Sequence, residues 1–311
     1  MTSTTTTVIT GGSSGLGLVT ARHLVAAGQT VVLVGRDAAR TVAAADSLRG
    51  LAPAGRGTAP PRTYTADLEQ WSQVRDLAKR LAAGAVSVDV LINNAGGRVP
   101  PLRADRGRRR ADLRPQPPRA FPAHARPPGR RNARPEARIV NLSTLVEKRG
   151  KVDTGDPDVT GRSWQTRFYH QINVYASSKL VSLLATRELA RRLPDGMSAY
   201  NADPGMVKGT AINSNAGGLM RLTAPLFKPF AVAPDTGVRT VVRLATAAPA
   251  PRPNGGFFSK SRPTTPSRPA QDDDLAGTVY DRTAHLLGVE PPRRPPDRQP
   301  GAFPSPPSNS P

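Results

Sequence analysis

A tyrosine and a lysine four residues apart are the first residues that could do chemistry. Tyr175 and Lys179 occur in "VYASSKL", residues 174–180, within a helical pattern at 173–193. Residues at i and i+4 share one helix face, so the phenol and the ammonium are predicted to be neighbours. A phenol has a pKa of about 10, and a nearby cation stabilises the phenolate and lowers that pKa. Such pairs are also common on amphipathic helices, so the rest of the chain must decide between a catalytic and a structural role.

A glycine-rich turn near the N-terminus is the second candidate site. The stretch "TGGSSGLG", residues 10–17, lies between a β-branched run at 4–10 and a helical pattern at 18–28. Glycines let the backbone approach a pyrophosphate, and the following helix start offers free N–H groups and a positive dipole end. The spacing is G-x-x-x-G-x-G rather than the commoner G-x-G-x-x-G. A simple turn is the alternative, but the position in a first β–α unit favours cofactor binding.

The end of the second apolar run bears on the choice of cofactor. Residues 30–36 end in Arg36, and Asp37 follows. An acidic residue at this point accepts the ribose 2′-hydroxyl of NAD, whereas an arginine suits the 2′-phosphate of NADP. A solvated arginine at a strand end is the alternative. The order of the two residues favours NADP over NAD.

The elements around these motifs alternate between strands and helices. This order predicts a Rossmann-type, doubly wound parallel sheet of about seven strands in a single domain. Strands are predicted at 4–10, 30–36, 62–68, 88–96, 137–144, 197–205 and 255–259, and helices at 18–28, 37–48, 69–84, 173–193 and 233–248. A polar loop is expected at 145–173, and an irregular, partly apolar segment at 206–234.

Six motifs in a fixed order carry a family resemblance. They are "TGGSSGLG", "ADL" (66–68), "NNAG" (93–96), "IVNLST" (139–144), "YASSK" (175–179) and "DPGMVKGT" (203–210). The chain resembles the short-chain dehydrogenase/reductase family over about residues 4–290, apart from one block. It is most similar to the retinol dehydrogenase and protochlorophyllide reductase-like branch, which has a similar long insert before the tyrosine and a Pro-Gly-x-Val-x-x-Thr turn. The resemblance implies an oxidoreductase that interconverts a carbonyl and an alcohol with a nicotinamide cofactor.

The resemblance also implies roles for single residues. Tyr175 would be the general acid for reduction or the base for oxidation. Lys179, with the cation of the oxidised cofactor, would lower its pKa and would hold the nicotinamide ribose. The family's substrate-binding serine matches Thr144, whose hydroxyl can make the same hydrogen bond, with Ser143 as the fallback.

The cofactor contacts implied by the resemblance lie on five loops. Asp67 and Leu68 would contact the adenine, 94–96 its ribose side, and Pro204, Gly205 and Val207 the nicotinamide. The full set besides Tyr175 and Lys179 is Gly11, Ser13, Ser14, Gly15, Leu16, Gly17, Arg36, Asp67, Leu68, Asn94, Ala95, Gly96, Pro204, Gly205 and Val207. For each of these groups of residues, the alternative is that they only shape the loop and do not contact a cofactor.

One block departs from the family pattern. Residues 98–134 hold twelve arginines, no lysine and two aspartates, so they supply ten of the chain's net charge of +21. The family has a helix there that carries an Asn-His-Leu-Gly motif, whose Asn completes a proton relay, and that commonly packs at an oligomer interface. Eight prolines in the block oppose a helix. We therefore expect a disrupted fourth helix, which weakens the case for a homo-oligomer.

Three interpretations of this block compete. It is a nucleic-acid-binding arm, a disordered insertion, or a translation of a shifted reading frame. Read one base later, codons for 105–125 permit the family's helix, and the Asn arises from the codons of Gln116 and Pro117; this interpretation is favoured. Nucleic acid has little support, since the block holds no lysine, one aromatic and no recognisable motif. The alternative function is a non-catalytic, cofactor- or nucleic-acid-binding relative that uses the block.

The remaining expectations come from composition. The chain lacks cysteine, which excludes disulfides and thiolate metal sites, and no metal site is predicted. No signal peptide and no apolar run of about 18 residues is found, so we expect no membrane span and a cytoplasmic protein. Residues 1–288 are expected to form the domain, and the Pro-rich 289–311 a disordered tail. The 206–234 segment would cover the substrate, and its apolar residues indicate an apolar, bulky compound.

Overall fold

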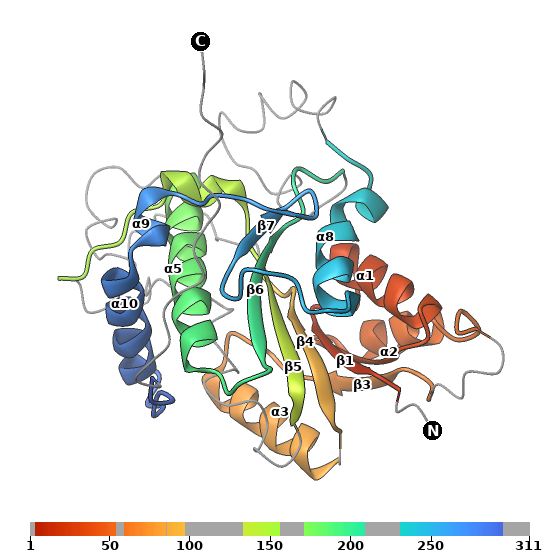
Figure 1. The fold of residues 1–311 in the computed structure, drawn as a ribbon. Helices are drawn as coiled ribbons and strands as arrows, with labels where there is room; N and C mark the ends of the chain where they lie inside the picture. Colours follow the sequence, from red (N-terminus) through yellow and green to blue (C-terminus); the bar gives the residue numbers. More distant parts are fainter. Residues whose placement is uncertain are drawn as a thin grey trace, which may run out of the picture.

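A single sheet forms the centre of the molecule (Figure 1). The computed structural model describes residues 4–53, 59–84, 86–96, 133–155, 171–208 and 231–294. Within these ranges the sheet has eight strands in the order β3-β2-β1-β4-β5-β6-β7-β8, parallel except for β8. The strands are β1 Thr6–Thr10, β2 Thr30–Gly35, β3 Arg62–Thr65, β4 Val88–Asn93, β5 Ala133–Leu142, β6 Ser198–Asp203, β7 Phe257–Ser259 and β8 Arg262–Pro263. The doubly wound parallel sheet is confirmed, with one strand more than the seven expected.

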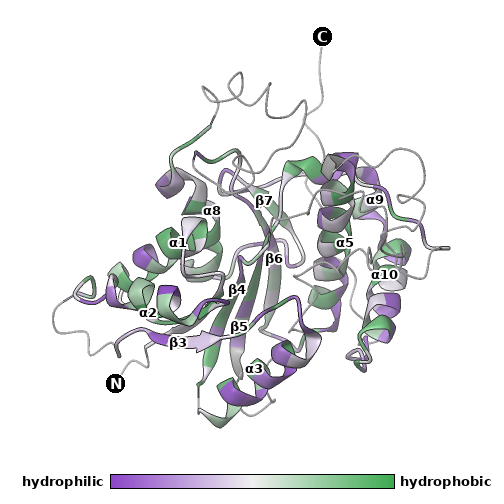
Figure 2. Cartoon of the chain, turned by 180° about the vertical axis from the view of Figure 1, so that it is seen from behind, coloured by the Kyte–Doolittle hydropathy of each residue, from purple (hydrophilic) through white to green (hydrophobic). Residues whose placement is uncertain are grey.

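Helices cover both faces of this sheet, as a parallel sheet requires. On one face α1 (Gly15–Ala26), α2 (Ala38–Asp46) and α8 (Pro234–Thr246) share a core with the strands. On the other lie α3 (Trp71–Ala83) and α5 (Gln171–Arg192), and α10 (Asp273–Leu286) with the short α9 (Arg268–Gln271) packs outside α5. Figure 2 shows hydrophobic residues concentrated on the strands, and hydrophilic ones on the outer turns of α3 and α10.

The alternation of side chains along β6 determines what faces α5. Tyr200 and Ala202 belong to the core with α1 and α8, whereas Ala199 packs with residues of α5. Because alternate residues of a strand point to opposite faces, Asn201 and Asp203 project toward α5. The strand therefore presents polar groups to the helix that carries Tyr175.

A buried polar chain links the central strands to α5. The Asn93 amide donates to Asn141 Oδ1 at 2.7 Å, and Asn141 donates to Thr186 Oγ1 at 2.8 Å. Asn141 is the register partner of both Asn93 on β4 and Asn201 on β6. Buried amides are stable only when they are hydrogen-bonded, so these side chains favour a single alignment of β4, β5 and α5.

The structure differs from the sequence-based expectation at several places. Strand β5 begins at Ala133, earlier than the predicted 137, and its backbone pairs with Val88 across a register shift. A 3-10 helix, η2 (Leu145–Arg149), opens the predicted polar loop. Helix α10 was not predicted. The rest of the Arg/Pro-rich block lies outside the described residues, so its disruption of the fourth helix stays a prediction.

The described part of the C-terminal segment contacts α5. Arg294 donates to Glu188 of α5, and the Pro292 carbonyl accepts from Arg192. The cation of Arg294 thus stabilises a buried carboxylate, while the domain boundary at 288 and the disordered tail beyond it stay predictions. None of the described helices combines the length and apolar character needed to cross a membrane.

Candidate active site

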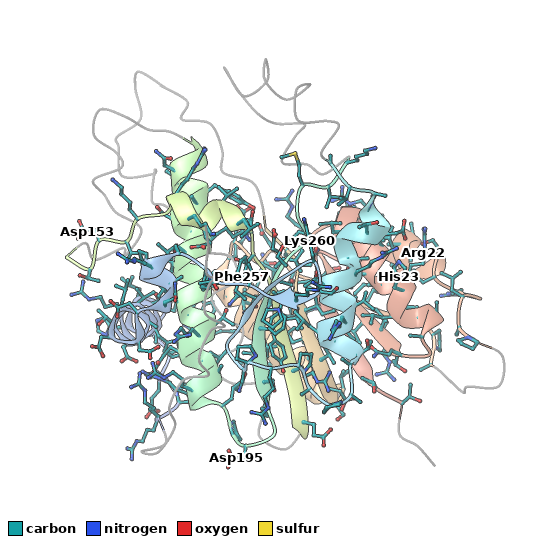
Figure 3. All side chains as sticks on the ribbon, turned by 45° about the horizontal axis from the view of Figure 1, so that its top comes forward. Arg22, His23, Asp153, Asp195, Phe257 and Lys260 are labelled. Carbon is teal, nitrogen blue, oxygen red and sulfur yellow. The ribbon has the colours of Figure 1, made fainter. Side chains whose placement is uncertain are left out.

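Apart from Tyr175 and Lys179 on α5, the predicted site residues follow the carboxyl ends of the parallel strands. In open α/β sheets this edge is where ligands bind. Figure 3 helps to locate it: Lys260, just after β7, lies at this edge, and Asp195, just after α5, lies at the opposite one. The segments after β1, β2, β3, β4, β5 and β6 carry the predicted residues.

The glycine-rich turn has the geometry of an anion cradle. Gly11 and Gly15 have φ of +64° and +54°, a conformation that favours glycine. A Cβ on Gly17 would collide with the Gly11 carbonyl oxygen, whereas one on Gly15 would meet no atom within 4 Å. Helix α1 begins here, and its N-cap Ser14 makes no side-chain cap hydrogen bond. The open space beside uncapped helical N–H groups and two serine hydroxyls fits a pyrophosphate.

The loop after β4 is fastened to this turn. Asn94 Nδ2 donates to the carbonyl oxygens of Thr10 and Gly11, both at 3.0 Å, and the Ala95 N–H donates to Thr10 Oγ1 at 3.1 Å. Asn94 thus supports the glycine turn directly. Gly96 has φ of +156°, and a Cβ there would lie 3.9 Å from Lys179 Nζ, so this loop reaches from the glycine turn to the lysine.

At the end of β2, the arginine and the aspartate have different surroundings. Asp37 caps α2, since its Oδ1 accepts from the Arg40 N–H at 2.9 Å. The Arg36 side chain is 60% exposed, with a guanidinium nitrogen 3.9 Å from Glu69 Oε1. The carboxylate is therefore engaged in the helix cap, and the cation is accessible.

The two predicted adenine contacts also have structural partners. Asp67 Oδ1 accepts from the Glu69 N–H at 3.0 Å, and the Asp67 N–H donates to Gln73 Oε1 at 2.8 Å. Leu68 packs against the apolar cluster between the sheet and α3. These contacts order the loop after β3 beside the end of β2.

Tyr175 and Lys179 are neighbours on α5, as predicted. Lys179 Nζ lies 5.7 Å from the centre of the tyrosine ring and donates to the Leu142 carbonyl at the end of β5, at 2.9 Å. Burial lowers the pKa of Lys179 to about 8. The ammonium therefore bridges α5 to the strand that carries the predicted substrate-binding hydroxyls.

The pKa of Tyr175 differs from the expectation. Burial and, second, the negative charge of Asp203 raise the pKa of Tyr175 to about 12. The sequence alone predicts a lowered pKa of Tyr175, through Lys179 together with a cofactor cation. Loss of solvation and the negative charge of Asp203 both disfavour the phenolate, and together they outweigh the positive charge of Lys179. Without a cofactor, these groups keep Tyr175 protonated at neutral pH.

The two hydroxyl residues after β5 have different environments. The Ser143 N–H donates to the Ala202 carbonyl at 2.8 Å, which places this turn beside the end of β6. Within the residues that the structure describes, the buried Ser143 Oγ has no hydrogen-bond partner. Thr144 is half-buried and its Oγ1 accepts from the Val146 N–H at 3.3 Å as the N-cap of η2. The Thr144 O–H is still able to donate.

The turn after β6 packs against the start of α1. Gly205 has φ of +72°, and buried Val207 bridges to Val232. A Cβ on Gly237 of α8 would lie 2.6 Å from Val207 Cγ2 and 3.6 Å from Leu16 Cδ2. This close approach brings the predicted nicotinamide side and the predicted pyrophosphate side together.

Sequence reasoning missed Asp203, the last residue of β6. Its side chain is 3% exposed. Oδ1 accepts from the Gly205 N–H at 3.1 Å, Oδ2 accepts from Ser259 Oγ at 2.8 Å, and the Leu145 N–H also donates to the carboxylate. Burial raises the pKa of Asp203, against the lowering effect of these donors. The signal in the sequence was an acid at the end of a buried strand, directly before Pro-Gly.

Comparisons with known proteins agree with this geometry. The short chain dehydrogenase family model matches residues 5–109. A candidate daunorubicin C-13 ketoreductase, DnrU, of Streptomyces sp. (strain C5) is 30% identical over 284 residues, which cover 91% of this chain and 92% of that protein. The chain belongs to the short-chain dehydrogenase/reductase family. Retinol dehydrogenase 13 of Homo sapiens is 28% identical over 293 residues, covering 92% of this chain and 86% of that protein.

A solved short-chain dehydrogenase-like fold matches as well. The crystal structure of an uncharacterised protein from Mycobacterium paratuberculosis superposes with a TM-score of 0.67 at 28% identity, covering 93% of this chain and 95% of that chain. The resemblance to the retinol dehydrogenase-like branch is confirmed by several relatives of that name. The protein is thus an oxidoreductase of a family that uses nicotinamide cofactors.

Proposed function

We propose that the protein is an NADP-dependent oxidoreductase that interconverts a carbonyl and an alcohol, with Tyr175 as general acid and base. One observation carries the proposal: Lys179, a neighbour of Tyr175 on α5, donates to the end of β5 next to the hydroxyl residues and also lies close to the loop that supports the glycine turn. The family supplies carbonyl–alcohol chemistry in general, and this constellation supplies the residues to perform it.

Each residue has a physical task in this proposal. A bound nicotinamide cofactor would supply or accept the hydride. Tyr175 Oη gives its proton to the carbonyl oxygen during reduction, and takes it back from the alcohol during oxidation. The Thr144 hydroxyl donates a hydrogen bond to the same oxygen, and Lys179 stabilises the phenolate that the proton transfer leaves behind. Tyr175 and Lys179 are half-buried, and their low-polarity surroundings strengthen these interactions.

The end of β2 supports the choice of NADP. Arg36 is exposed, and a guanidinium binds a phosphate through paired, charge-assisted hydrogen bonds. Asp37, which could otherwise accept from a ribose hydroxyl, already accepts from the Arg40 N–H. We propose that Arg36 contacts the 2′-phosphate of NADP and that NAD binds more weakly.

Apolar residues at the rim of the site support an apolar substrate. Leu145 and Met206 are 40% and 44% exposed, and they follow Thr144 and Gly205 in the chain. In this proposal the two side chains are part of the apolar lining that the substrate contacts. The relatives named above are named for retinol and for daunorubicin, two bulky compounds that each contain an extended apolar framework. We propose a substrate of this chemical class.

The test is turnover of two probes by the purified chain. Retinal and daunorubicin are offered with NADPH or NADH, and cofactor oxidation is followed by absorbance. We expect reduction of at least one probe, faster with NADPH, and none with the Tyr175→Phe chain. Equal turnover by Tyr175→Phe would overturn the tyrosine's role. Equal use of both cofactors at low concentration would overturn the NADP preference.

The Arg/Pro-rich block sets the condition for this activity. The sequence predicts that the chain as written is poorly soluble and weakly active, and that restoring the frame across 98–134 increases both. The nucleotide sequence of codons 96–137 checks the interpretation: a shifted frame containing stops, or lacking Asn-His-Leu-Gly, would contradict it. The boundary at 288 and the cytoplasmic location likewise stay predictions.

A further inference from the structure

We propose that Asp203 is a positioning residue that joins three loops around the active site and keeps Tyr175 in its protonated, proton-donating form. The inference rests on the proposed function of Tyr175 and concerns the pH range over which the tyrosine can serve each direction of the reaction. It follows from the place of Asp203 in the sheet, from its hydrogen bonds and from the charges around it.

The first step is the position of the carboxylate. Asp203 ends β6, and the preceding carbonyl, of Ala202, accepts from the Ser143 N–H at 2.8 Å. Its side chain points to the α5 face of the sheet, because it alternates with Ala202 of the opposite core. Tyr175 is on α5, so the carboxylate lies on the same face as the phenol and beside the hydroxyl residues after β5.

The second step is the hydrogen bonding. The three groups bonded to Asp203 come from the loops after β5, β6 and β7: the N–H groups of Leu145 and Gly205 and the hydroxyl of Ser259. N–H groups can only donate, and an ionised carboxylate only accepts, so these partners suit the charged form. The charge is thus solvated by neutral dipoles, and within the described part of the chain none of its hydrogen-bond partners is a cation.

The third step is the effect on Tyr175. A negative charge that is not neutralised by a cation disfavours a second negative charge nearby. The Asp203 charge accordingly raises the pKa of Tyr175, in addition to the larger effect of burial. A tyrosine that stays protonated is the donor required for carbonyl reduction, whereas alcohol oxidation requires phenolate.

The other charged groups near the site act differently. Lys179 faces Tyr175 from α5, but burial lowers the pKa of this amine to about 8, so its charge is lost in alkaline solution. Glu147 of η2 accepts from the N–H and Oγ of Ser267, and the positive charge of Lys148 favours the ionised form of Glu147. Lys260, next to Ser259, is exposed. Among the residues that the structure describes, Asp203 is therefore the charged group that opposes ionisation of Tyr175.

The main experiment is the pH dependence of retinal reduction and of retinol oxidation. Above the pKa of Tyr175 the reduction rate falls, and the oxidation rate reaches its plateau. In Asp203→Asn, which keeps the side-chain shape, we expect both midpoints to move toward acid by about one pH unit. The matched control Ser259→Ala removes one donor and keeps the charge, so its midpoints should not move. Asp203→Glu should restore the parent midpoints.

Two outcomes separate this inference from its alternatives. If Asp203→Asn lowers the rates equally at every pH and leaves the midpoints in place, Asp203 is only structural and the inference is overturned. If Tyr175→Phe keeps full turnover, the proposed function fails instead. Should Asp203→Asn not fold, Asp203→Ser replaces it as a smaller neutral variant.

A second measurement works without turnover. The ultraviolet absorbance of tyrosinate in the full chain is compared with that of Tyr175→Phe at one alkaline pH at which both stay folded. The difference reports the ionised fraction of Tyr175. We expect this fraction to rise in Asp203→Asn and to stay unchanged in Ser259→Ala. Equal fractions in parent and Asp203→Asn would overturn the inference even for a chain with no measurable activity.

Discussion

Two buried carboxylates in different regions of the molecule are stabilised in different ways. Glu188, inaccessible to solvent on α5, bonds to three arginines: Arg192 at 2.6 Å, Arg294 at 2.7 Å and Arg191 at 3.3 Å. Asp203, 3% exposed at the carboxyl edge, bonds among the described residues to neutral N–H and O–H donors. The first group lies where α5 meets α10 and the C-terminal segment, and the second lies beside Tyr175.

The difference separates a structural charge from one that acts on a reactive group. The arginines around Glu188 neutralise it locally, so its effect is to fix α5, α10 and Arg294 in one arrangement. The donors around Asp203 stabilise its charge without cancelling it, so the field extends to the phenol. Burial alone therefore does not identify a functional carboxylate, but the charge of its partners is informative.

The largest effect is expected at the group on which the Asp203 field acts. Tyr175→Phe removes the transferable proton and keeps the ring, so turnover of retinal should fall roughly a hundred- to ten-thousand-fold. NADPH affinity, measured by fluorescence titration, should stay within a few-fold. Substantial turnover by the Phe chain would remove the reason to distinguish Asp203 from Glu188.

The next effect is on stability, at the structural carboxylate. Glu188→Gln removes the buried anion that three arginines share, although Arg191 and Arg192 keep Asp273 and Asp281 as partners. Breaking a buried ion pair of this kind costs up to about 3–5 kcal/mol of unfolding free energy. Denaturant unfolding measures the loss. Asp281→Asn is the matched control, since Asp281 pairs with the same Arg192 at 2.7 Å but is 54% exposed, and it should cost at most about 1 kcal/mol. If Glu188→Gln also displaces the pH midpoint of the reaction that depends on Tyr175, the proposed difference between Glu188 and Asp203 is wrong.

A smaller effect is expected at Arg36, which tests the cofactor side of the site. Arg36→Ala should weaken NADP binding by about 1.5–3 kcal/mol, the size of a hydrogen bond to a charged group. NAD binding should change little. Calorimetric titration of both cofactors gives the two losses, and equal losses would show that Arg36 does not contact the 2′-phosphate.

The smallest effect is expected at Glu147, a third buried carboxylate, which bonds to Ser267 and lies near the positive charge of Lys148. Burial raises its pKa, although the Ser267 hydroxyl and N–H oppose this. The folded state thus holds the proton more tightly than the unfolded state, so this contribution to stability is full below the unfolded pKa and is lost as pH rises through the folded pKa. Glu147→Gln should lack that loss. Melting temperatures of both chains from mildly acidic to neutral pH check it, and parallel curves would contradict it.

The sequence was sufficient where the signal is local. The glycine turn and the Tyr175–Lys179 pair depend on spacing within one turn or one helix, and both were placed correctly. The partners of Asp203 and Glu188 are distant in the chain, at Ser259 and Arg294, so no local pattern could have indicated them.

The start of β5 and the whole of α10 were missed for local reasons. Pro135 argues against a strand, because proline cannot donate to a sheet, yet the β5 backbone begins before it. For α10, the buried residues recur at helical spacing and Asp272 caps the helix, so the signal was present. The buried set is Ala276, Val279, Tyr280, Thr283 and Ala284.

The amide chain from Asn93 through Asn141 to Thr186 has a consequence for how the molecule can change. Asn93 and Asn141 belong to the strands on either side of the Arg/Pro-rich block, and their hydrogen bond fixes the alignment of those strands near their carboxyl ends. A slip of one residue would separate the amides and turn them to the wrong face. The segment that connects the two strands can then be replaced, by frame restoration or by grafting from a relative, without a change in the register of the sheet.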